Sequence, residues 1–228
     1  GYSSAASDVY KRQIRGSLVA LITPFNEDGS VNFDKLGELI DFHLANSTDA
    51  LVILGTTGES STMSHEEDNA VCEYTVKRVA GRIPVIAGSG SNSTQTMLEK
   101  SLSYERLGAD GLLLITPYYN KTNEEGMYLH FKTVADAVKI PCILYNVPGR
   151  TGCSISVANV ARLSQHPNIV GIKEASGNMS YAAKVAKYLS DDFAMYSGND
   201  DMIVPLLSIG ASGVISVLAN IAPKETHQ

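Results

Sequence analysis

The chain has 228 residues, of which 44% are hydrophobic, and its mean hydropathy is −0.01. These values are ordinary for a soluble globular protein with one large domain or two small ones. A net charge of −6, with Lys and Arg scattered along the chain, argues against a nucleic-acid partner. No apolar run approaches the roughly 18–20 residues of a membrane span, which argues against a membrane partner.

The three cysteines, Cys72, Cys142 and Cys153, are odd in number, far apart and form no CxxC pair. This usage is typical of a reducing compartment, so a cytoplasmic location is expected, with Cys142 as a small core residue. Residues 1–13 show neither strand nor helix periodicity and lack the apolar core of a signal peptide. We predict a non-native or disordered N-terminal tail there and one folded unit over residues 14–228.

From residue 16 onward, strand-length apolar runs alternate with helical patterns. Phe33, Leu36, Ile40 and Leu44 form one helical face between the first two runs. Later helices are predicted to begin at two capping boxes, Ser-His-Glu-Glu at 64–67 and Thr-Asn-Glu-Glu at 122–125, and Gly108 and Gly210 are expected as C-terminal caps. The eight apolar runs are residues 18–22, 50–54, 84–87, 111–115, 142–145, 169–173, 193–196 and 213–217.

Continuous apolar strands that alternate with helices predict an α/β fold with a parallel sheet covered by helices. Eight such units favour a closed (β/α)8 TIM barrel over an open doubly wound sheet, which usually has fewer strands. Only residues 219–228 follow the eighth strand. We therefore expect a barrel that is C-terminally truncated, lacks the last barrel helix and a C-terminal helical region, and leaves the outer face of the first and last strands poorly covered.

The run at 169–176 is a predicted strand with a lysine placed where the apolar residues stop. Side chains alternate along a strand, so Ile169, Gly171 and Lys173 are expected on one face and Val170 and Ile172 on the other. Gly171 would leave room for the lysine stem. Burial lowers the pKa of an ammonium group, and the neutral amine can form a Schiff base with a carbonyl. The alternative is an ordinary lysine that reaches solvent.

Polar residues follow most of the other predicted strands. In a parallel barrel the carboxyl ends of the strands meet on one rim, where active sites form. Hydroxyls, phenols, one arginine and one lysine would gather there, which favours a catalytic Lys173. The polar strand ends are Gly-Thr-Thr-Gly-Glu-Ser at 55–60, Thr-Pro-Tyr-Tyr-Asn at 116–120, Tyr-Asn-Val-Pro-Gly-Arg-Thr-Gly at 145–152, Ser-Gly-Asn-Asp at 197–200 and Ile-Ser at 215–216.

These groups suit chemistry on small oxo-acids. Tyr145, one strand from Lys173, is the nearest group that could shuttle the protons of Schiff-base formation. The Thr56–Thr57 pair offers hydroxyls and backbone N–H groups to a carboxylate, and Arg150 offers a bidentate fork to a second one. Two carboxylate anchors and an amine nucleophile indicate a reaction that joins or parts two oxo-acids.

Motifs for other chemistries are weak. The glycine-rich segment at 88–93 lacks the third glycine of a dinucleotide fingerprint, and no Walker lysine or GxSxG elbow occurs. The histidines form no HxxxH or HExxH motif and lie in or beside predicted helices, so we interpret them as surface or capping residues and expect no metal site. They are His43, His65, His130, His166 and His227.

The sequence resembles the dihydrodipicolinate synthase family of pyruvate-dependent class I aldolases from about residue 16 onward. The motifs that carry this resemblance are those at 55–60, 118–119, 145–152, 171–175 and 213–216. The resemblance implies a lyase of lysine (diaminopimelate) biosynthesis that condenses pyruvate with L-aspartate 4-semialdehyde to 4-hydroxy-tetrahydrodipicolinate. It implies no cofactor beyond a covalent pyruvate imine on Lys173, and a tight dimer that becomes a homotetramer in the full-length protein.

The resemblance also implies a role for each matching residue. Lys173 would form the Schiff base and Tyr145 would donate and accept protons. Thr56 would complete the proton relay together with Tyr119 from the neighbouring subunit. The remaining matches are substrate-binding residues: Thr57 and the main chain at Ile215 for pyruvate, and Arg150 for the carboxylate of the semialdehyde.

A lysine-effector site is implied at the dimer interface of feedback-inhibited members. Ser60, His65, Asn92 and Tyr118 match it, but Asp68 and Thr96 stand where a histidine and a glutamate are usual. We therefore predict weak or absent inhibition by lysine.

Two alternatives stay open. The first is a related lyase that acts on a longer 2-oxo sugar acid, such as N-acetylneuraminate lyase, although that branch tends to carry Ser-Thr at 56–57 and lacks an arginine at 150. The second is an inactive truncated fragment, or a barrel that only binds oxo-acids. Intact Lys173 and Tyr145 argue against this second alternative.

Overall fold

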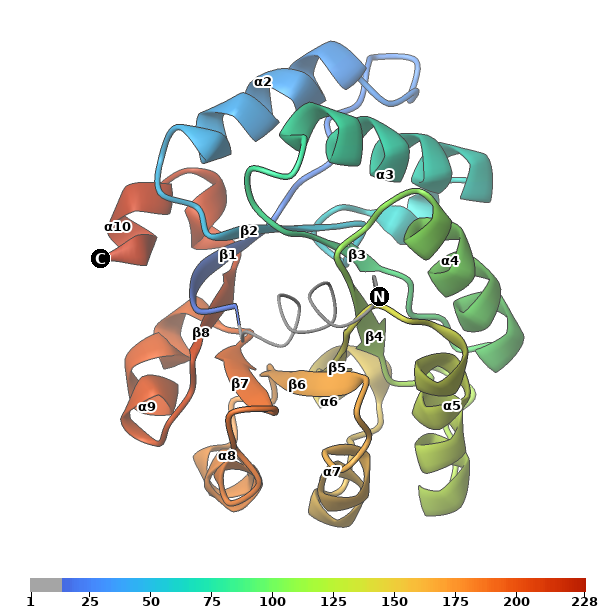
Figure 1. Cartoon of the computed structure of the whole chain (residues 1–228), viewed down its shortest axis with the longest axis vertical. Coiled ribbons are helices and arrows are strands. Elements are labelled where there is room, and N and C mark those ends of the chain that lie inside the picture. The colour runs from blue at the N-terminus through green and yellow to red at the C-terminus, as the bar shows by residue number, and fades with distance from the viewer. Residues whose placement is uncertain (1–13) are drawn as a thin grey trace, which may run out of the picture.

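The computed structural model describes residues 14–228, so the predicted tail at 1–13 lies outside the described residues. Eight parallel strands close into a barrel in chain order, and the first strand pairs with the last (Figure 1). The fold class predicted from the sequence is confirmed. The strands are β1 (Gly16–Ala20), β2 (Ala50–Ile53), β3 (Val85–Gly88), β4 (Gly111–Ile115), β5 (Cys142–Asn146), β6 (Ile169–Glu174), β7 (Ala194–Ser197) and β8 (Gly213–Ser216).

Helices follow the strands and form the outer ring seen in Figure 1. The α-helices are α2 (Phe33–Leu44), α3 (His65–Val79), α4 (Thr94–Arg106), α5 (Glu124–Ala137), α6 (Pro148–Thr151), α7 (Val157–Leu163), α8 (Met179–Ala186), α9 (Ile203–Ser208) and α10 (Pro223–His227). Three short 3-10 helices, η1 (Ser60–Thr62), η2 (Asp200–Met202) and η3 (Leu218–Asn220), lie in the loops after β2, β7 and β8.

Two layers of apolar side chains hold the barrel together. One layer lies between the strands and the surrounding helices and includes Leu36 and Ile40 of α2, as the helical pattern predicts, and Cys142. The other fills the barrel interior and includes Leu18, Ile86 and Ile215. A closed parallel sheet needs both layers, because each of its faces is removed from water.

The local signals at helix ends are largely confirmed. Ser64 accepts a hydrogen bond from the backbone of Glu67, whose side chain accepts one in return from the Ser64 backbone N–H. Gly108 and Gly210 have φ angles of +93° and +102°, which only glycine adopts readily. The predicted box at 122–125 is wrong by one residue: Asn123, itself a strong capping residue, accepts from the backbone N–H of Gly126.

The strict alternation predicted for the lysine strand is wrong at its first two residues. Ile169 packs in the outer layer and Val170 against the interior. The pairing of β5 with β6 shifts register there: Cys142 pairs with Ile169, but the next residue pairs with Gly171. Val170 is therefore the extra residue of a β-bulge. Because of this extra residue, Lys173 points into the barrel although Ile169 points out of it.

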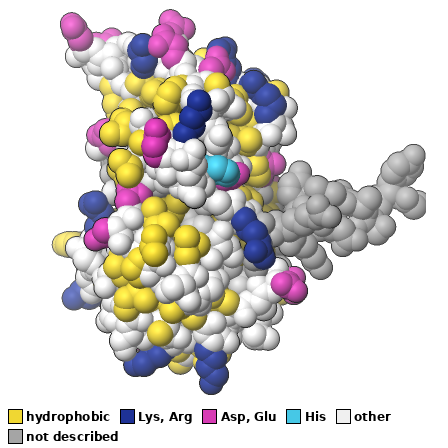
Figure 2. Space-filling view, turned by 90° about the vertical axis from the view of Figure 1, so that its left-hand side faces the viewer, with side chains coloured by type: hydrophobic (Ala, Val, Ile, Leu, Met, Phe, Trp, Pro, Cys, Tyr) yellow, Lys and Arg dark blue, Asp and Glu magenta, His cyan; other side chains and the backbone are white. Residues whose placement is uncertain are grey.

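The strands at the barrel seam are better covered than predicted. Val19 of β1 and Val214 of β8 are buried, because η3 and α10 lie against β1 and α9 lies against β8. Figure 2 shows that hydrophobic side chains gather at several places on one face of the molecule. Large apolar side chains are exposed after β1 and β8 and on α9. They are Ile22, Val204, Leu207, Val217, Leu218 and Ile221.

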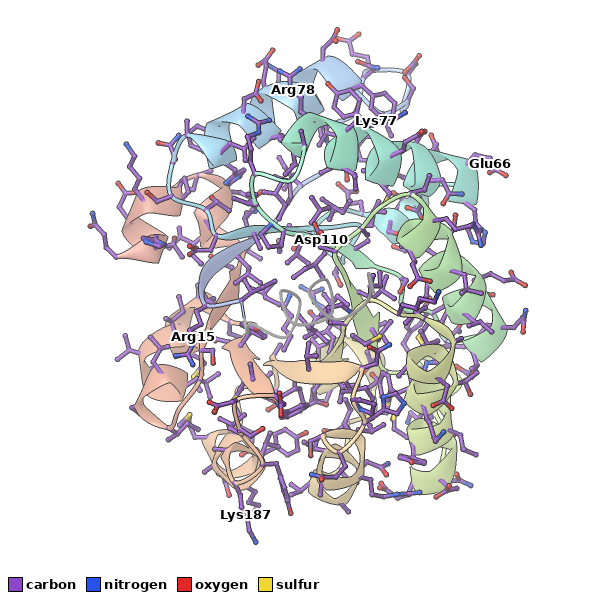
Figure 3. All side chains as sticks on the ribbon, in the orientation of Figure 1. Arg15, Glu66, Lys77, Arg78, Asp110 and Lys187 are labelled. Atoms are coloured by element: carbon purple, nitrogen blue, oxygen red, sulfur yellow. The ribbon has the colours of Figure 1, made fainter. Side chains whose placement is uncertain are left out.

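Charged side chains lie mainly on the outer surface of the helices. Figure 3 shows Glu66 and Lys187 pointing away from the barrel. Arg78 of α3 forms an ion pair with Asp41 of α2, which links two neighbouring helices. Within residues 14–228, no helix has the length and apolar character needed to cross a membrane.

Candidate active site

Lys173 lies near the carboxyl end of β6 with 6% of its surface exposed, so the solvent-exposed alternative is wrong. Burial in a dry environment lowers the pKa of its amine to about 8, from an ordinary value of 10.5. Arg150 lowers the pKa further by charge repulsion, and Asp200 partly offsets both effects. At pH 7 the neutral fraction of the amine is about 300-fold larger than for an ordinary lysine, because the two pKa values differ by about 2.5.

Tyr145 lies beside the lysine because the two residues are register partners on adjacent strands. The Lys173 Nζ is 4.4 Å from the centre of the Tyr145 ring. Burial raises the pKa of the Tyr145 phenol, while the charge of Arg150 and a hydrogen bond from Thr56 act in the opposite direction. Amine, phenol and hydroxyl are thus neighbours, as predicted from the strand ends.

The loop that carries Thr56 and Thr57 is held by the segment that follows β1. Thr23 donates a hydrogen bond of 2.6 Å to the carbonyl of Gly58. A side chain at Gly58 would meet the Leu21 carbonyl oxygen at 3.1 Å, so a glycine suits this position. Thr56 is exposed and lines the cavity described below, whereas Thr57 is half-buried.

Arg150 is carried by the short helix α6 in the loop after β5. The loop is closed by Thr151, whose hydroxyl donates to the carbonyls of Val147 and Cys153. Arg150 is exposed, yet its charge affects the pKa of both Lys173 and Tyr145. A guanidinium in this place can receive a substrate carboxylate beside the amine.

Tyr118 and Tyr119 behave differently although they are adjacent. Tyr118 is partly buried and faces a cavity described below. Tyr119 is 89% exposed and has a φ of +69°, an unusual backbone conformation for a tyrosine. Within the described chain, the ring of Tyr119 therefore projects into solvent.

Ile215 is fully buried in the centre of β8. The end of this strand is held by Asp200, which accepts hydrogen bonds from the Ser216 hydroxyl at 2.5 Å and from the backbone N–H of Leu218 at 2.9 Å. The sequence places Asp200 on the rim but gives it no role. Only the structure brings its charge close enough to raise the pKa of Lys173.

A cavity of about 440 Å³ opens beside these residues and is lined by Thr56, Tyr145 and Arg150. Lys173 does not line it but lies against Tyr145, which does. The cavity extends over α3 and α4, where Ser60, His65 and Tyr118 of the predicted effector site also line it. Asn92, the fourth member, does not reach it; its carbonyl accepts a hydrogen bond from Asn120.

A buried ion pair stands in the effector part of this cavity. The Lys100 Nζ lies 2.8 Å from Asp68, whose side chain is 1% exposed, and Ser60 hydrogen-bonds to both residues. The carboxylate of Asp68 is therefore already neutralised by a lysine of the same chain. Sequence reasoning missed Lys100, because its proximity to Asp68 arises from the packing of α3 against α4.

One further correction concerns the glycine beside the lysine. A side chain at Gly171 would meet the Ala194 carbonyl oxygen at 2.7 Å, so this glycine makes room for β7 rather than for the lysine stem. Gly198 is the glycine next to the lysine: a Cβ there would lie 3.1 Å from the Lys173 Cε. A substitution at Gly198 would therefore press on the lysine side chain.

The histidine interpretation is wrong for two of the five residues. His43 and His130 are buried and hydrogen-bond to Thr48 and Thr94. Burial lowers the pKa of each ring to about 4, so both are neutral structural residues. Among residues 14–228, no group of three or more His, Cys, Asp or Glu side chains is arranged to hold a metal ion.

Comparison with known proteins decides the family. The model of the "Dihydrodipicolinate synthetase family" matches residues 13–228. The chain belongs to the dihydrodipicolinate synthetase family. The 4-hydroxy-tetrahydrodipicolinate synthase 1 of Clostridium acetobutylicum is 56% identical over 213 residues, which are 93% of this chain and 72% of that protein.

Solved structures of the dihydrodipicolinate synthetase family agree with this assignment. The dihydrodipicolinate synthase of Aquifex aeolicus is 48% identical with a TM-score of 0.91, over 93% of this chain and 73% of that one. The enzyme of Acinetobacter baumannii, solved in complex with pyruvate, is 46% identical with a TM-score of 0.92, over 94% and 74%. The predicted fold, family and enzyme class are thus confirmed.

Proposed function

We propose that the chain condenses pyruvate with L-aspartate 4-semialdehyde through an imine on Lys173, as a cytoplasmic 4-hydroxy-tetrahydrodipicolinate synthase of lysine biosynthesis. Identity of 54–56% to synthases of that name, over 93% of the chain, supports the reaction. The buried amine of Lys173, whose pKa is lowered to about 8, carries the proposal because it supplies the nucleophile at neutral pH.

The first half of the reaction needs the amine and one proton shuttle. The neutral Lys173 amine attacks the keto carbon of pyruvate, a C–N bond forms, and the carbonyl oxygen leaves as water after two proton transfers. Loss of a methyl proton then converts the imine into an enamine, whose carbon attacks the aldehyde carbon of the second substrate and so re-forms the imine. The amino group of the second substrate then attacks the imine carbon, which closes the ring, breaks the bond to Lys173 and returns the free amine. Some of these steps need a proton donor and others a proton acceptor, so one group that can do both would serve the whole sequence.

We assign this shuttle to Tyr145, which lies against Lys173. Its phenol is neutral at pH 7 and hydrogen-bonds to Thr56, so a proton can be passed on without a net charge being left in the pocket. Tyr119 is proposed as the next member of the relay in a neighbouring subunit. Its 89% exposure on the surface supports a contact made outside its own chain, and with it a homo-oligomer.

The remaining residues are proposed to hold the substrates. Arg150 would pair with the carboxylate of the semialdehyde, and Thr57 and the main chain at Ile215 would hold pyruvate. A fixed carboxylate places the aldehyde carbon next to the enamine, which replaces a bimolecular encounter by an oriented one. The arginine also distinguishes this substrate from a long sugar acid, which carries hydroxyls at the corresponding end.

Borohydride trapping tests the proposal directly. Pyruvate and borohydride should add a stable reduced adduct to Lys173, detectable by mass spectrometry of the digested chain, and Lys173→Ala should take none. Turnover with aspartate 4-semialdehyde, measured beside N-acetylneuraminate, tests the substrate. No adduct on the wild-type chain would refute both enzymatic alternatives, whereas an adduct with turnover of the sugar acid alone would favour the lyase.

A further inference from the structure

A second pair of side chains lies directly behind the reacting pair. Asn146 and Glu174 are register partners, one step beyond Tyr145 and Lys173 on the same two strands. Because side chains alternate along strands, Asn146 and Glu174 point to the outside of the barrel while the reacting residues point inward. They are 0% and 2% exposed, so their polar atoms depend on one another and on the backbone.

The Asn146 amide connects three parts of the site. Its Nδ2 donates to Glu174 Oε2 at 3.0 Å, and its Oδ1 accepts from the backbone N–H of Ile155 at 3.0 Å and from the Ser154 hydroxyl at 3.1 Å. The orientation of the amide is fixed, since a backbone N–H can only donate. One side chain thus ties the end of β5 to β6 and also closes the loop that carries Arg150.

Glu174 is anchored equally firmly. Its other carboxylate oxygen, Oε1, accepts from the backbone N–H of Ser176 at 2.6 Å. A buried carboxylate with no partner would be costly, so the two N–H donors are what keep Glu174 in place. The far end of the loop has a second tie, because the Tyr181 hydroxyl of α8 donates to the Ile155 carbonyl at 2.7 Å.

We infer that Asn146 and Glu174 are positioning residues that hold Tyr145 and the Arg150 loop in register with Lys173. This inference rests on the proposed function. Neither residue touches the reacting atoms; each acts through the strand or loop that carries a reacting residue. A displacement of about 1 Å in such a site costs up to about 10²-fold in rate, so the pair has a kinetic role beyond its role in stability.

The inference can be tested by exchanging the amide and the carboxyl group between positions 146 and 174. Asn146→Asp would set two carboxylates against each other, and Glu174→Gln would turn one amide group toward another. The double variant Asn146→Asp/Glu174→Gln restores a donor facing an acceptor, and the carboxylate that it introduces on β5 can still accept from the backbone N–H of Ile155. Asn159→Asp is the matched control, because Asn159 is also buried and donates at 2.8 Å, but to the backbone carbonyl of Glu124 at the start of α5.

Each single variant should lower kcat/KM for the semialdehyde by about 10²-fold, with a raised KM for that substrate. The KM for pyruvate should be retained, and the borohydride adduct on Lys173 should still form, although more slowly because Tyr145 serves this step. The double variant should recover at least about tenfold in kcat/KM. The control should lose thermal stability, but its KM for the semialdehyde should not rise relative to its KM for pyruvate. A merely structural pair would lower stability in all variants and leave both KM values unchanged.

The inference would be overturned by single variants with wild-type kinetics. It would also be overturned if kcat/KM of the double variant did not exceed that of the less active single variant. Should a single variant not fold, the double variant decides: restored folding and turnover support the inference, and a failure to fold overturns it. A wild-type chain that traps no pyruvate would overturn the proposed function, and this inference with it. Unaffected variants of an active wild type overturn the inference alone.

Discussion

The lowered pKa of Lys173 predicts how fast pyruvate is trapped at different pH values. With a pKa of about 8, the neutral fraction of the amine is about 9% at pH 7 and about 50% at pH 8. Between about pH 8 and pH 9.5 it rises less than about twofold further. An ordinary lysine with a pKa of 10.5 would show about a 30-fold rise over that second interval, so the two cases separate clearly.

The assay is the initial rate of reduced adduct formation on Lys173 with pyruvate and excess cyanoborohydride, measured by mass spectrometry across this pH range. A rate that levels off above about pH 8.5 is expected. Arg150→Gln provides a signed control: removing a positive charge that lowers the pKa of Lys173 should move the curve to higher pH. A wild-type rate that climbs about tenfold per pH unit up to pH 10 would refute the reasoning.

Three further predictions concern stability and regulation. Lys173→Met should raise the free energy of unfolding by up to about 3 kcal/mol at pH 7, because the wild-type chain buries a charged amine there. Denaturant titrations should show this gain shrinking from pH 8 to pH 10.5, where the amine becomes neutral in the folded and then in the unfolded chain; an equal gain at every pH would contradict this origin. Between pH 6.5 and pH 4 the His43→Gln variant should lose about 3 kcal/mol less of its free energy of unfolding than the wild-type chain. The reason is that the unfolded chain takes up a proton on this ring near pH 6.5, whereas the folded chain takes it up only near pH 4. Parallel pH curves for the two proteins would count against a buried neutral His43. Turnover should be unchanged at millimolar lysine because Lys100 already pairs with Asp68, and strong inhibition would refute this prediction.

The sequence alone determined the barrel and the centre of the site. Strand and helix periodicity are local properties, and eight alternating units leave few ways to bury continuous apolar strands. The chemistry of the rim followed from the same pattern, because the carboxyl ends of parallel strands meet in one place. Lys173 and Tyr145 could therefore be paired before any coordinate was known.

Contacts between elements distant in sequence were decided only by the tertiary structure. The bulge at Val170 arises from the register of β5 against β6, and no residue type near it predicts this change of register. The charge of Asp200 reaches Lys173, and Lys100 meets Asp68, because strand ends and helix faces were brought together by packing. Burial of His43 and His130 likewise depends on which helix face turns inward. Local patterns fix which elements form, whereas side-chain partners across elements depend on angles and registers that arise when the whole barrel closes.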